Sequence, residues 1–240
     1  MNYLKNITAY LCMLGISLAS QAQNTQEEVM KEQVKFKNGP WTMAGELYLP
    51  ESFSHESKYA AIIVVHPGGG VKEQTAGRYA ERMAGEGFVA IAFDASHQGE
   101  SEGEPRRLDS PYNRVEDVKC AVDFLTTLPY IDRSRIGAMG ICAGGGYVIN
   151  AALTEKRIKV VAGVSPVDAG LSTRQGWTGG NTLESQLKMM EQIAEARTAE
   201  ANGEAPKLVN YVPETVTDGL HPDFVEAHDY YRTSRGGHPN

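Results

Sequence analysis

The sequence predicts an α/β fold built on a doubly wound, mostly parallel β-sheet. Three runs of small and β-branched apolar residues, 60–65, 87–93 and 135–141, have the composition of strands covered on both faces. Each run ends in a loop of glycine or polar residues, and helical patterns separate the runs. The length of 240 residues and the 41% hydrophobic content fit one globular domain of ordinary size.

The other elements of this core follow from the same patterns. Two strands are predicted before the first buried run, at 32–37 and 43–49, because the second partly alternates and both are bounded by turn residues. One more strand is predicted at 158–164. Helices are predicted between the strands, at 75–84, 117–128 and 144–153.

The pattern changes after residue 168. Residues 182–201 predict one long polar helix with a narrow apolar stripe formed by Leu183, Leu187, Met190 and Ile193. We therefore divide the chain into a core at 23–168 and a helical excursion at 169–240. Such an excursion covers an active site or is a surface helix without that role, and the pattern leaves both open.

The most informative motif is G-x-C-x-G, with Cys142 between Gly140 and Gly144. It lies between a predicted strand and a predicted helix, the context of a nucleophile elbow. The glycines let strand and helix approach closely, and the helix N-terminus favours a thiolate at Cys142. The alternative is that Cys142 is a small buried apolar residue in a glycine-rich turn.

A second motif follows the first buried strand, at residues 66–70. It reads His-Pro-Gly-Gly-Gly and is similar to loops that supply one backbone N–H group to an oxyanion hole. Pro67 has no N–H group, so Gly68 is the predicted donor, paired with the N–H group of Ala143. A plain glycine-rich loop or a phosphate cradle is the alternative. Neither glycine-rich loop contains the Gly-Lys-Ser/Thr of a phosphate-binding loop or the G-x-G-x-x-G of a dinucleotide site.

A third motif, at residues 94–101, follows the buried run at 87–93. Together the three motifs resemble the α/β-hydrolase superfamily. The nearest resemblance is to the dienelactone-hydrolase-like branch with a cysteine nucleophile, among bacterial relatives of fungal polyketide transferases and thiohydrolases. His97 lies in the third motif, but in this family the base follows the nucleophile in the chain, so His97 is expected to order its loop. The resemblance implies hydrolysis or transfer of an acyl group from a small ester, lactone or thioester. It implies Cys142 as nucleophile and no cofactor.

The strands that carry the acid and the histidine in this family are not evident after Cys142. The only later strand-like run is 208–212, and reading it as a strand would offer Asp218 with one of three later histidines, His221, His228 or His238. Asp168 occupies an acid position used by a minority of the superfamily. We expect instead that the last two strands are missing and that the chain is truncated at its C-terminus. The acid and the histidine would then lie beyond residue 240, leaving an enzyme of little or no activity. The alternative is a non-catalytic pseudoenzyme or binding module on the same fold.

The N-terminus predicts export. Residues 7–19 form an apolar segment of signal-peptide length, and Ser20-Gln21-Ala22 fits a cleavage site, so 1–22 is a predicted signal peptide. We expect a periplasmic or secreted protein without a stable membrane anchor. Of the cysteines that remain, Cys120 lies on a helical pattern, and spacing does not decide whether it pairs with Cys142. A net charge of −7 argues against nucleic acid as a partner and leaves a small acyl substrate.

Overall fold

The computed structural model describes residues 29–240, and the predicted signal peptide lies outside this part of the chain. The strands are β1 (Met30–Asn38), β2 (Trp41–Leu49), β3 (Tyr59–Val65), β4 (Val89–Phe93), β5 (Ile131–Ile141) and β6 (Ile158–Val164). The helices are η1 (Lys72–Ala76), α1 (Gly77–Gly85), α2 (Pro111–Thr127), α3 (Ala143–Thr154), α4 (Ala169–Gln175), α5 (Leu183–Ala201) and α6 (Pro222–Tyr231).

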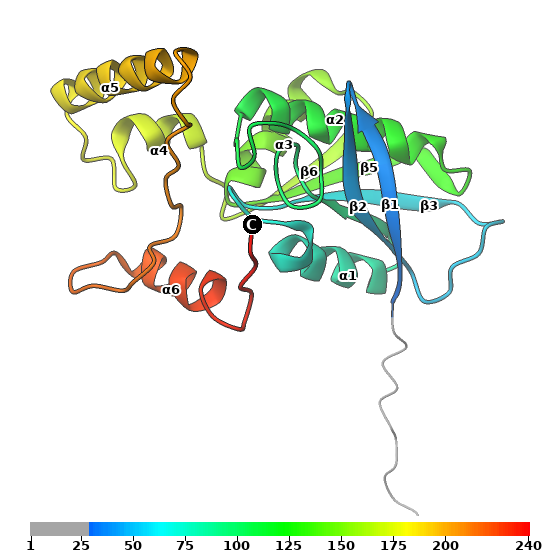
Figure 1. Cartoon of the computed structure of the whole chain (residues 1–240). Coiled ribbons are helices and arrows are strands. Elements are labelled where there is room, and N and C mark those ends of the chain that lie inside the picture. The colour runs from blue at the N-terminus through cyan, green and yellow to red at the C-terminus, as the bar shows by residue number, and fades with distance from the viewer. Residues whose placement is uncertain (1–28) are drawn as a thin grey trace, which may run out of the picture.

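The strands form one six-stranded sheet in the order β1-β2-β4-β3-β5-β6. β1 and β2 pair antiparallel, β2 is antiparallel to β4, and the other neighbours are parallel. The chain winds from β3 to β4 in one direction and from β4 to β5 and β6 in the other. Because such crossovers are right-handed, α1 covers one face of the sheet, and α2 and α3 cover the other (Figure 1). The predicted fold class is confirmed.

Both faces of the central strands β3 and β4 are buried, which explains their continuous apolar runs. On one face, α2 and α3 pack through Val118, Leu125 and Val148 onto the sheet. On the other face, α1 presents Ala80 and Ala84 to small residues of β4. The alanine contacts bring α1 close to the sheet, and burial of the two faces supplies the main stabilisation of the core.

Three boundaries differ from the prediction. α2 begins six residues earlier than predicted, with a proline in its first turn, because the inward residues there are the buried polar Arg114 and Asp117 and give no apolar stripe. β5 begins at Ile131, before the predicted run. The predicted helix at 75–84 begins as the wider turn η1 and continues as α1.

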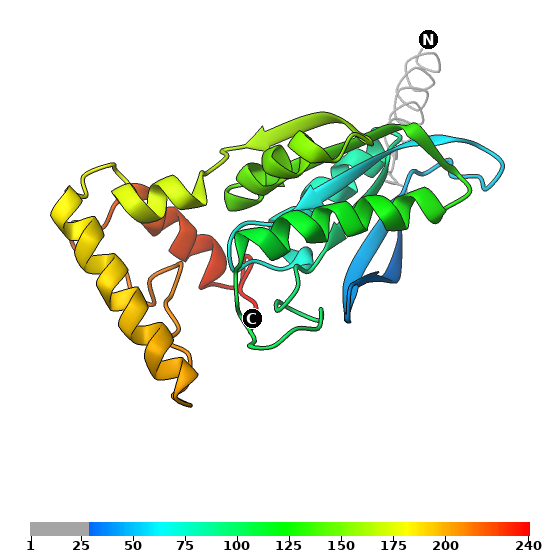
Figure 2. The same ribbon diagram turned by 90° about the horizontal axis from the view of Figure 1, so that it is seen from above.

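Residues 169–231 extend to one side of the core (Figures 1 and 2). The predicted long helix is present as α5, but its apolar stripe is between 48% and 71% exposed. The run at 208–212 is not a strand and is not part of the sheet; it lies between two prolines, which cannot donate to a strand ladder. Within residues 29–240 the sheet therefore ends at β6, whose outer edge is unpaired.

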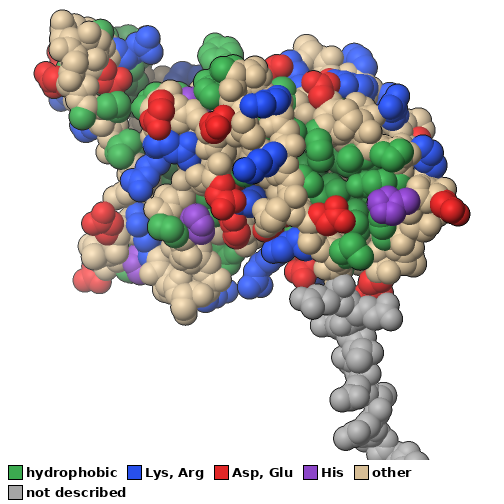
Figure 3. Space-filling model, turned by 45° about the vertical axis from the view of Figure 1, so that its right-hand side comes forward, with side chains coloured by type: hydrophobic (Ala, Val, Ile, Leu, Met, Phe, Trp, Pro, Cys, Tyr) green, Lys and Arg blue, Asp and Glu red, His purple; other side chains and the backbone are tan. Residues whose placement is uncertain are grey.

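The surface is mixed in character. Figure 3 shows acidic and basic side chains interspersed over one face, with apolar side chains gathered in a patch at the right of the view. Among the helices of residues 29–240, none combines the length and the apolar character needed to cross a membrane.

Candidate active site

Cys142 lies at the junction where β5 ends and α3 begins. Its backbone has φ 54° and ψ −122°, a conformation that is strained for a residue with a side chain. The junction is also too tight for side chains on its glycines. A Cβ on Gly140 would lie 2.1 Å from the carbonyl oxygen of Gly144, and a Cβ on Gly144 would lie 2.5 Å from that of Val65. The spacing of the two glycines around Cys142 is therefore a packing requirement of this strand-to-helix turn.

The three predicted site residues lie together. The backbone N–H groups of Ala143 and Gly68 are close enough to the Cys142 sulfur to lower the pKa of its thiol by hydrogen bonding. Burial nevertheless raises the pKa of the thiol above its ordinary value of 9.0, and these two hydrogen bonds and the positive charge of Arg114 offset only part of the increase. The N–H group of Ala143 at the helix N-terminus lowers the thiol pKa, as expected, but burial outweighs this effect and the net pKa is raised.

The side chain of His66 fixes the position of the loop that carries Gly68. The His66 ring is fully buried, with Nδ1 2.7 Å from the carbonyl oxygen of Pro67, and Nε2 accepts from the backbone N–H of Ala95 at 3.1 Å. Burial, and next the charge of Arg114, lowers the pKa of His66 well below its usual value, so the ring is neutral. With Nε2 as acceptor, Nδ1 carries the proton and donates to Pro67. His66 therefore fixes the loop and is not free to act as a base.

A polar cluster borders the same loop. It consists of Asp109, Arg114, Tyr147 and Tyr211. Arg114 is 1% exposed, donates through Nη2 to the His66 carbonyl oxygen at 2.6 Å, and lies over the Tyr147 ring at 4.9 Å. The Tyr211 hydroxyl is 3.4 Å from Oδ2 of Asp109. Sequence reasoning missed this cluster, because its members come from three separate segments and follow no local spacing.

Tyr211 brings the excursion into the site. A Cβ built on Gly68 or Gly69 would lie 3.2 or 3.1 Å from the Tyr211 ring, so the ring covers the glycine loop closely. Tyr211 is 57% exposed, but partial burial, and next the Asp109 carboxylate, raises its pKa to about 12. The segment read as a possible strand thus contributes an aromatic cover for the loop instead.

No hydrogen bond joins any of the chain's six histidines to Cys142 in the part of the chain that the structure describes. His97 is buried, with its ring nitrogens against Asn113 and the Pro105 carbonyl oxygen, and it orders its loop as expected. The three later histidines bond to the backbone of Asp223, Glu214 and Asn240. None of the three hydrogen-bonds with Asp218, so the self-contained triad is not assembled.

Three carboxylates lie close enough together to form a candidate cation site. Those of Glu73, Asp94 and Glu100 lie within 4.8 Å of one another. The buried ammonium of Lys72 lies among them, at 2.5, 3.0 and 2.8 Å. The ammonium group of Lys72 therefore already neutralises part of the negative charge of this cluster and occupies its centre.

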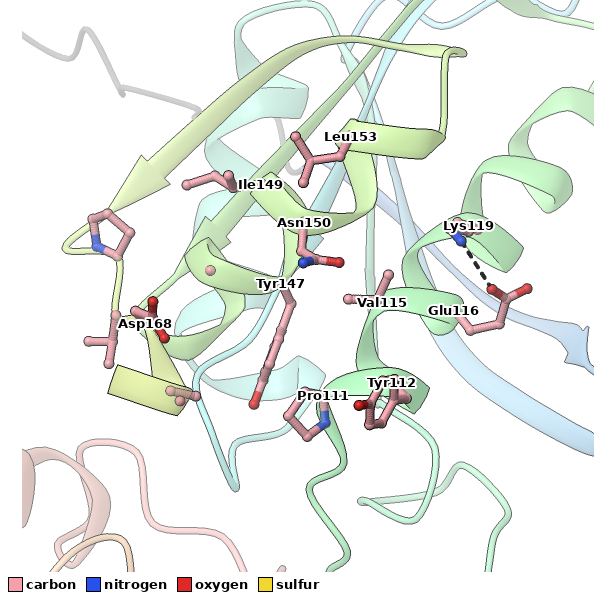
Figure 4. A pocket seen from close by; sticks show the side chains of 15 residues that line it. Pro111, Tyr112, Val115, Glu116, Lys119, Tyr147, Ile149, Asn150, Leu153 and Asp168 are labelled. Atoms are coloured by element: carbon pink, nitrogen blue, oxygen red, sulfur yellow. Dashed lines mark ion pairs between the residues drawn. The ribbon is translucent and has the colours of Figure 1, made fainter. Parts of the chain in front are cut away.

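A groove of about 910 Å³ lies between α2 and α3, with the loop after β6 along its third side (Figure 4). Val115, Ile149 and Leu153 give it apolar walls, and Lys119 pairs with Glu116 on its rim. Tyr147 points from α3 into the groove, and its ring also contacts Arg114. The tyrosine therefore connects the groove with the polar cluster beside Cys142.

Comparison with known proteins agrees with this fold. The sequence profile of the Dienelactone hydrolase family matches residues 43–204. The chain is 43% identical to the uncharacterized protein YcjY of Escherichia coli over 214 residues, which cover 88% of this chain and 70% of YcjY. It is 28% identical to thiohydrolase AneE of Aspergillus aculeatus, over 79% of this chain and 57% of AneE.

A solved structure extends the likeness to three dimensions. The crystal structure of the hypothetical protein PA2218 from Pseudomonas aeruginosa has a TM-score of 0.83 and 38% identity, covering 89% of this chain and 66% of that one. In sequence, the chain spans 53% of the length of PA2218. Residues 43–204, which match the family profile, include Gly68, Cys142 and Ala143. The chain therefore belongs to the dienelactone hydrolase family of α/β hydrolases.

Proposed function

We propose that this chain hydrolyses or transfers the acyl group of a small ester, lactone or thioester, with Cys142 as the nucleophile. The observation that carries the proposal is the convergence of two backbone N–H groups on the sulfur of a strained strand-to-helix turn. A carbonyl carbon bonded to that sulfur would place its oxygen within reach of the same donors. Gly68 and Ala143 would then stabilise the oxyanion. The name of thiohydrolase AneE supports a thioester among the substrates.

The chemistry has two steps. In the first, the Cys142 thiol gives its proton to a base, its sulfur bonds to the acyl carbon, and the bond from that carbon to the leaving oxygen or sulfur breaks. The leaving group departs with a proton. In the second, water adds to the acyl carbon, the bond to sulfur breaks, and the thiol regains its proton. If an alcohol or thiol replaces water, the acyl group is transferred.

The base is the part of this mechanism that residues 29–240 do not supply. Their histidines form no hydrogen bond with Cys142, and the burial that raises the thiol pKa leaves little thiolate at neutral pH. The relatives are longer than the parts that match this chain. We therefore propose that the complete enzyme takes its histidine and acid from further sequence and that the chain as given acylates slowly.

Acylation of Cys142 tests this function directly. Incubation with p-nitrophenyl acetate should release p-nitrophenol up to one equivalent, with an acetyl group on the Cys142 peptide in mass spectrometry. Cys142→Ala should abolish the burst, whereas the control Cys120→Ala should keep it. A burst that survives Cys142→Ala would remove the cysteine from the mechanism.

The absence of a base also favours a second candidate, a non-catalytic binding module on the same fold. This protein would bind acyl compounds without forming any adduct on Cys142, so the same assay separates the two candidates.

We also propose that the protein is exported, and the support for this is the sequence of the N-terminal segment. If residues 1–22 are a signal peptide, N-terminal sequencing of protein from the periplasm or the medium should begin near Gln23. Material that keeps Met1 would contradict export by cleavage.

A further inference from the structure

Asp109 is the carboxylate that borders the proposed active site. It lies two residues before the start of α2, and its side chain is only 6% exposed. Its Oδ2 would lie 3.2 Å from a Cβ on Gly68, the residue whose N–H group is close to the Cys142 sulfur. Its charge also acts on the thiol. A group held by Asp109 would therefore lie close to an acyl group on the sulfur.

One oxygen of this carboxylate has no hydrogen-bond partner. Oδ2 faces the Tyr211 hydroxyl, but Oδ1 is buried and accepts no hydrogen bond. The nearest cation is Nη1 of Arg114, at 3.7 Å, which is too far for a hydrogen bond. The other terminal nitrogen of Arg114 is engaged with His66. A buried acceptor without a donor is costly, and a ligand that brings a donor removes the cost.

The neighbours of Asp109 indicate what kind of donor fits. Arg114 already places a full positive charge beside the carboxylate, so a second cation such as an ammonium group would be repelled. Tyr147 and Tyr211 add uncharged hydroxyl groups around it. The environment therefore favours a neutral donor, and a hydroxyl group is a compact neutral donor that an acyl chain can carry.

We propose that Asp109 is a specificity-determining residue that selects acyl groups carrying a hydroxyl near the carbonyl. This inference rests on the proposed function, because it assigns the acyl group that Cys142 receives. The hydroxyl donates to Oδ1 of Asp109 while the carbonyl carbon meets the Cys142 sulfur. The unsubstituted acyl group leaves the acceptor unpaired and reacts more slowly.

The test compares three activated esters on the full chain: p-nitrophenyl butyrate and the two enantiomers of p-nitrophenyl 3-hydroxybutyrate. The rate constant for acylation of Cys142 is divided by that for a free thiol, N-acetylcysteine, which removes the intrinsic reactivity of each ester. One hydroxylated enantiomer should exceed butyrate by about tenfold or more after this correction, as expected for a hydrogen bond to a charged acceptor. A corrected ratio of one in the unmodified protein would overturn the proposal without any variant.

Variants then assign the preference to Asp109. Asp109→Leu should bring the corrected ratio close to one, and Asp109→Asn should lower it, since the amide oxygen is an uncharged acceptor. Asp218→Asn, at an exposed position of the excursion, should leave the ratio unchanged. Because each ratio compares two substrates on one protein, a partial loss of folded material cancels. A ratio that stays at its unmodified value in Asp109→Leu would overturn the assignment.

A binding measurement separates this proposal from the proposed function. Saturation-transfer NMR with the unreactive amides of butyrate and 3-hydroxybutyrate needs no acylation. Preferential, Asp109-dependent binding of the hydroxylated amide, with no acylation by either ester, would support the selectivity and refute Cys142 acylation. Equal binding of both amides, together with equal corrected acylation, would overturn the selectivity and leave the nucleophile intact.

Discussion

Arg114 Nη2 donates a 2.6 Å hydrogen bond to the carbonyl oxygen of His66. This bond ties the first turn of α2 to the residue that precedes the Pro67–Gly70 loop. The same guanidinium faces Asp109 and the Tyr147 ring. One buried cation thus connects the glycine loop, the polar cluster and α3, although these segments are far apart in the sequence.

Replacement of this cation should destabilise the fold. Arg114→Met leaves Asp109 buried without its counter-charge and the His66 carbonyl oxygen without its donor, so we expect a loss of about 3 kcal/mol in the free energy of unfolding. Urea denaturation followed by circular dichroism measures it. Arg135→Met is the matched control, because Arg135 pairs with Asp132 at an exposed site and should cost less than about 1 kcal/mol. Equal losses for the two variants would show that the Arg114 contacts do not stabilise the fold.

Addition of a single methyl group should disrupt the turn at Cys142. Gly144→Ala places a Cβ 2.5 Å from the Val65 carbonyl oxygen and 2.7 Å from that of His66, and backbone atoms cannot move aside easily. We expect a loss of about 3 kcal/mol or failure to fold. Gly85→Ala, at the end of α1, meets nothing within 4 Å and should be neutral or slightly stabilising. Melting temperatures of the pair provide the comparison, and a Gly144→Ala protein as stable as Gly85→Ala would contradict the tight crossing.

Alkylation of Cys142 should depend on pH with a high midpoint. Only the thiolate reacts, and burial raises the thiol pKa above its ordinary 9.0, so the iodoacetamide rate should be low at pH 7 and rise through and beyond pH 9. Cys120 is an internal control, because burial, and next nearby carboxylates, raises its pKa to about 11. Mass spectrometry of both peptides across the pH range gives the two profiles. A midpoint for Cys142 below pH 8 would mean that a base or a cation activates it.

Turnover should be much weaker than acylation. With p-nitrophenyl acetate in excess, we expect the burst at Cys142 to be followed by a steady rate near the uncatalysed one, since no imidazole is positioned to activate water. Stopped-flow and long time courses on the same sample separate the two phases. Efficient turnover that Cys142→Ala abolishes would instead identify a base among His97, His221, His228 and His238. Single glutamine substitutions would then show which histidine it is.

The central strands were predictable because burial on both faces leaves a continuous apolar run, as in 60–65 and 87–93. The tight turn was predictable because Gly140 and Gly144, on either side of Cys142, are the residues that allow a strand and a helix to approach this closely. The start of α2 was not, since Arg114 and Asp117 face inward and break the apolar stripe that would mark the helix.

The electrostatics of the site could not be predicted without knowledge of the fold. The N–H donors at Cys142 follow from the local motif, but the burial that outweighs them depends on distant segments. The contact between Asp109 and Tyr211 joins positions 102 residues apart, and neither has a recognisable local pattern. Tyr211 in particular lies in a run whose apolar residues suggested a strand, and only its position over the glycine loop shows its role.

The unpaired edge of β6 affects how the protein behaves when concentrated. Its backbone groups offer hydrogen bonds to a second strand, and Val160 is 68% exposed beside them. Lys156 and Lys159 place positive charge at the start of this edge, and like charges keep two such edges apart at low ionic strength. High salt screens that repulsion, so a dilute, low-salt buffer is the appropriate choice for keeping the protein monodisperse during purification and storage.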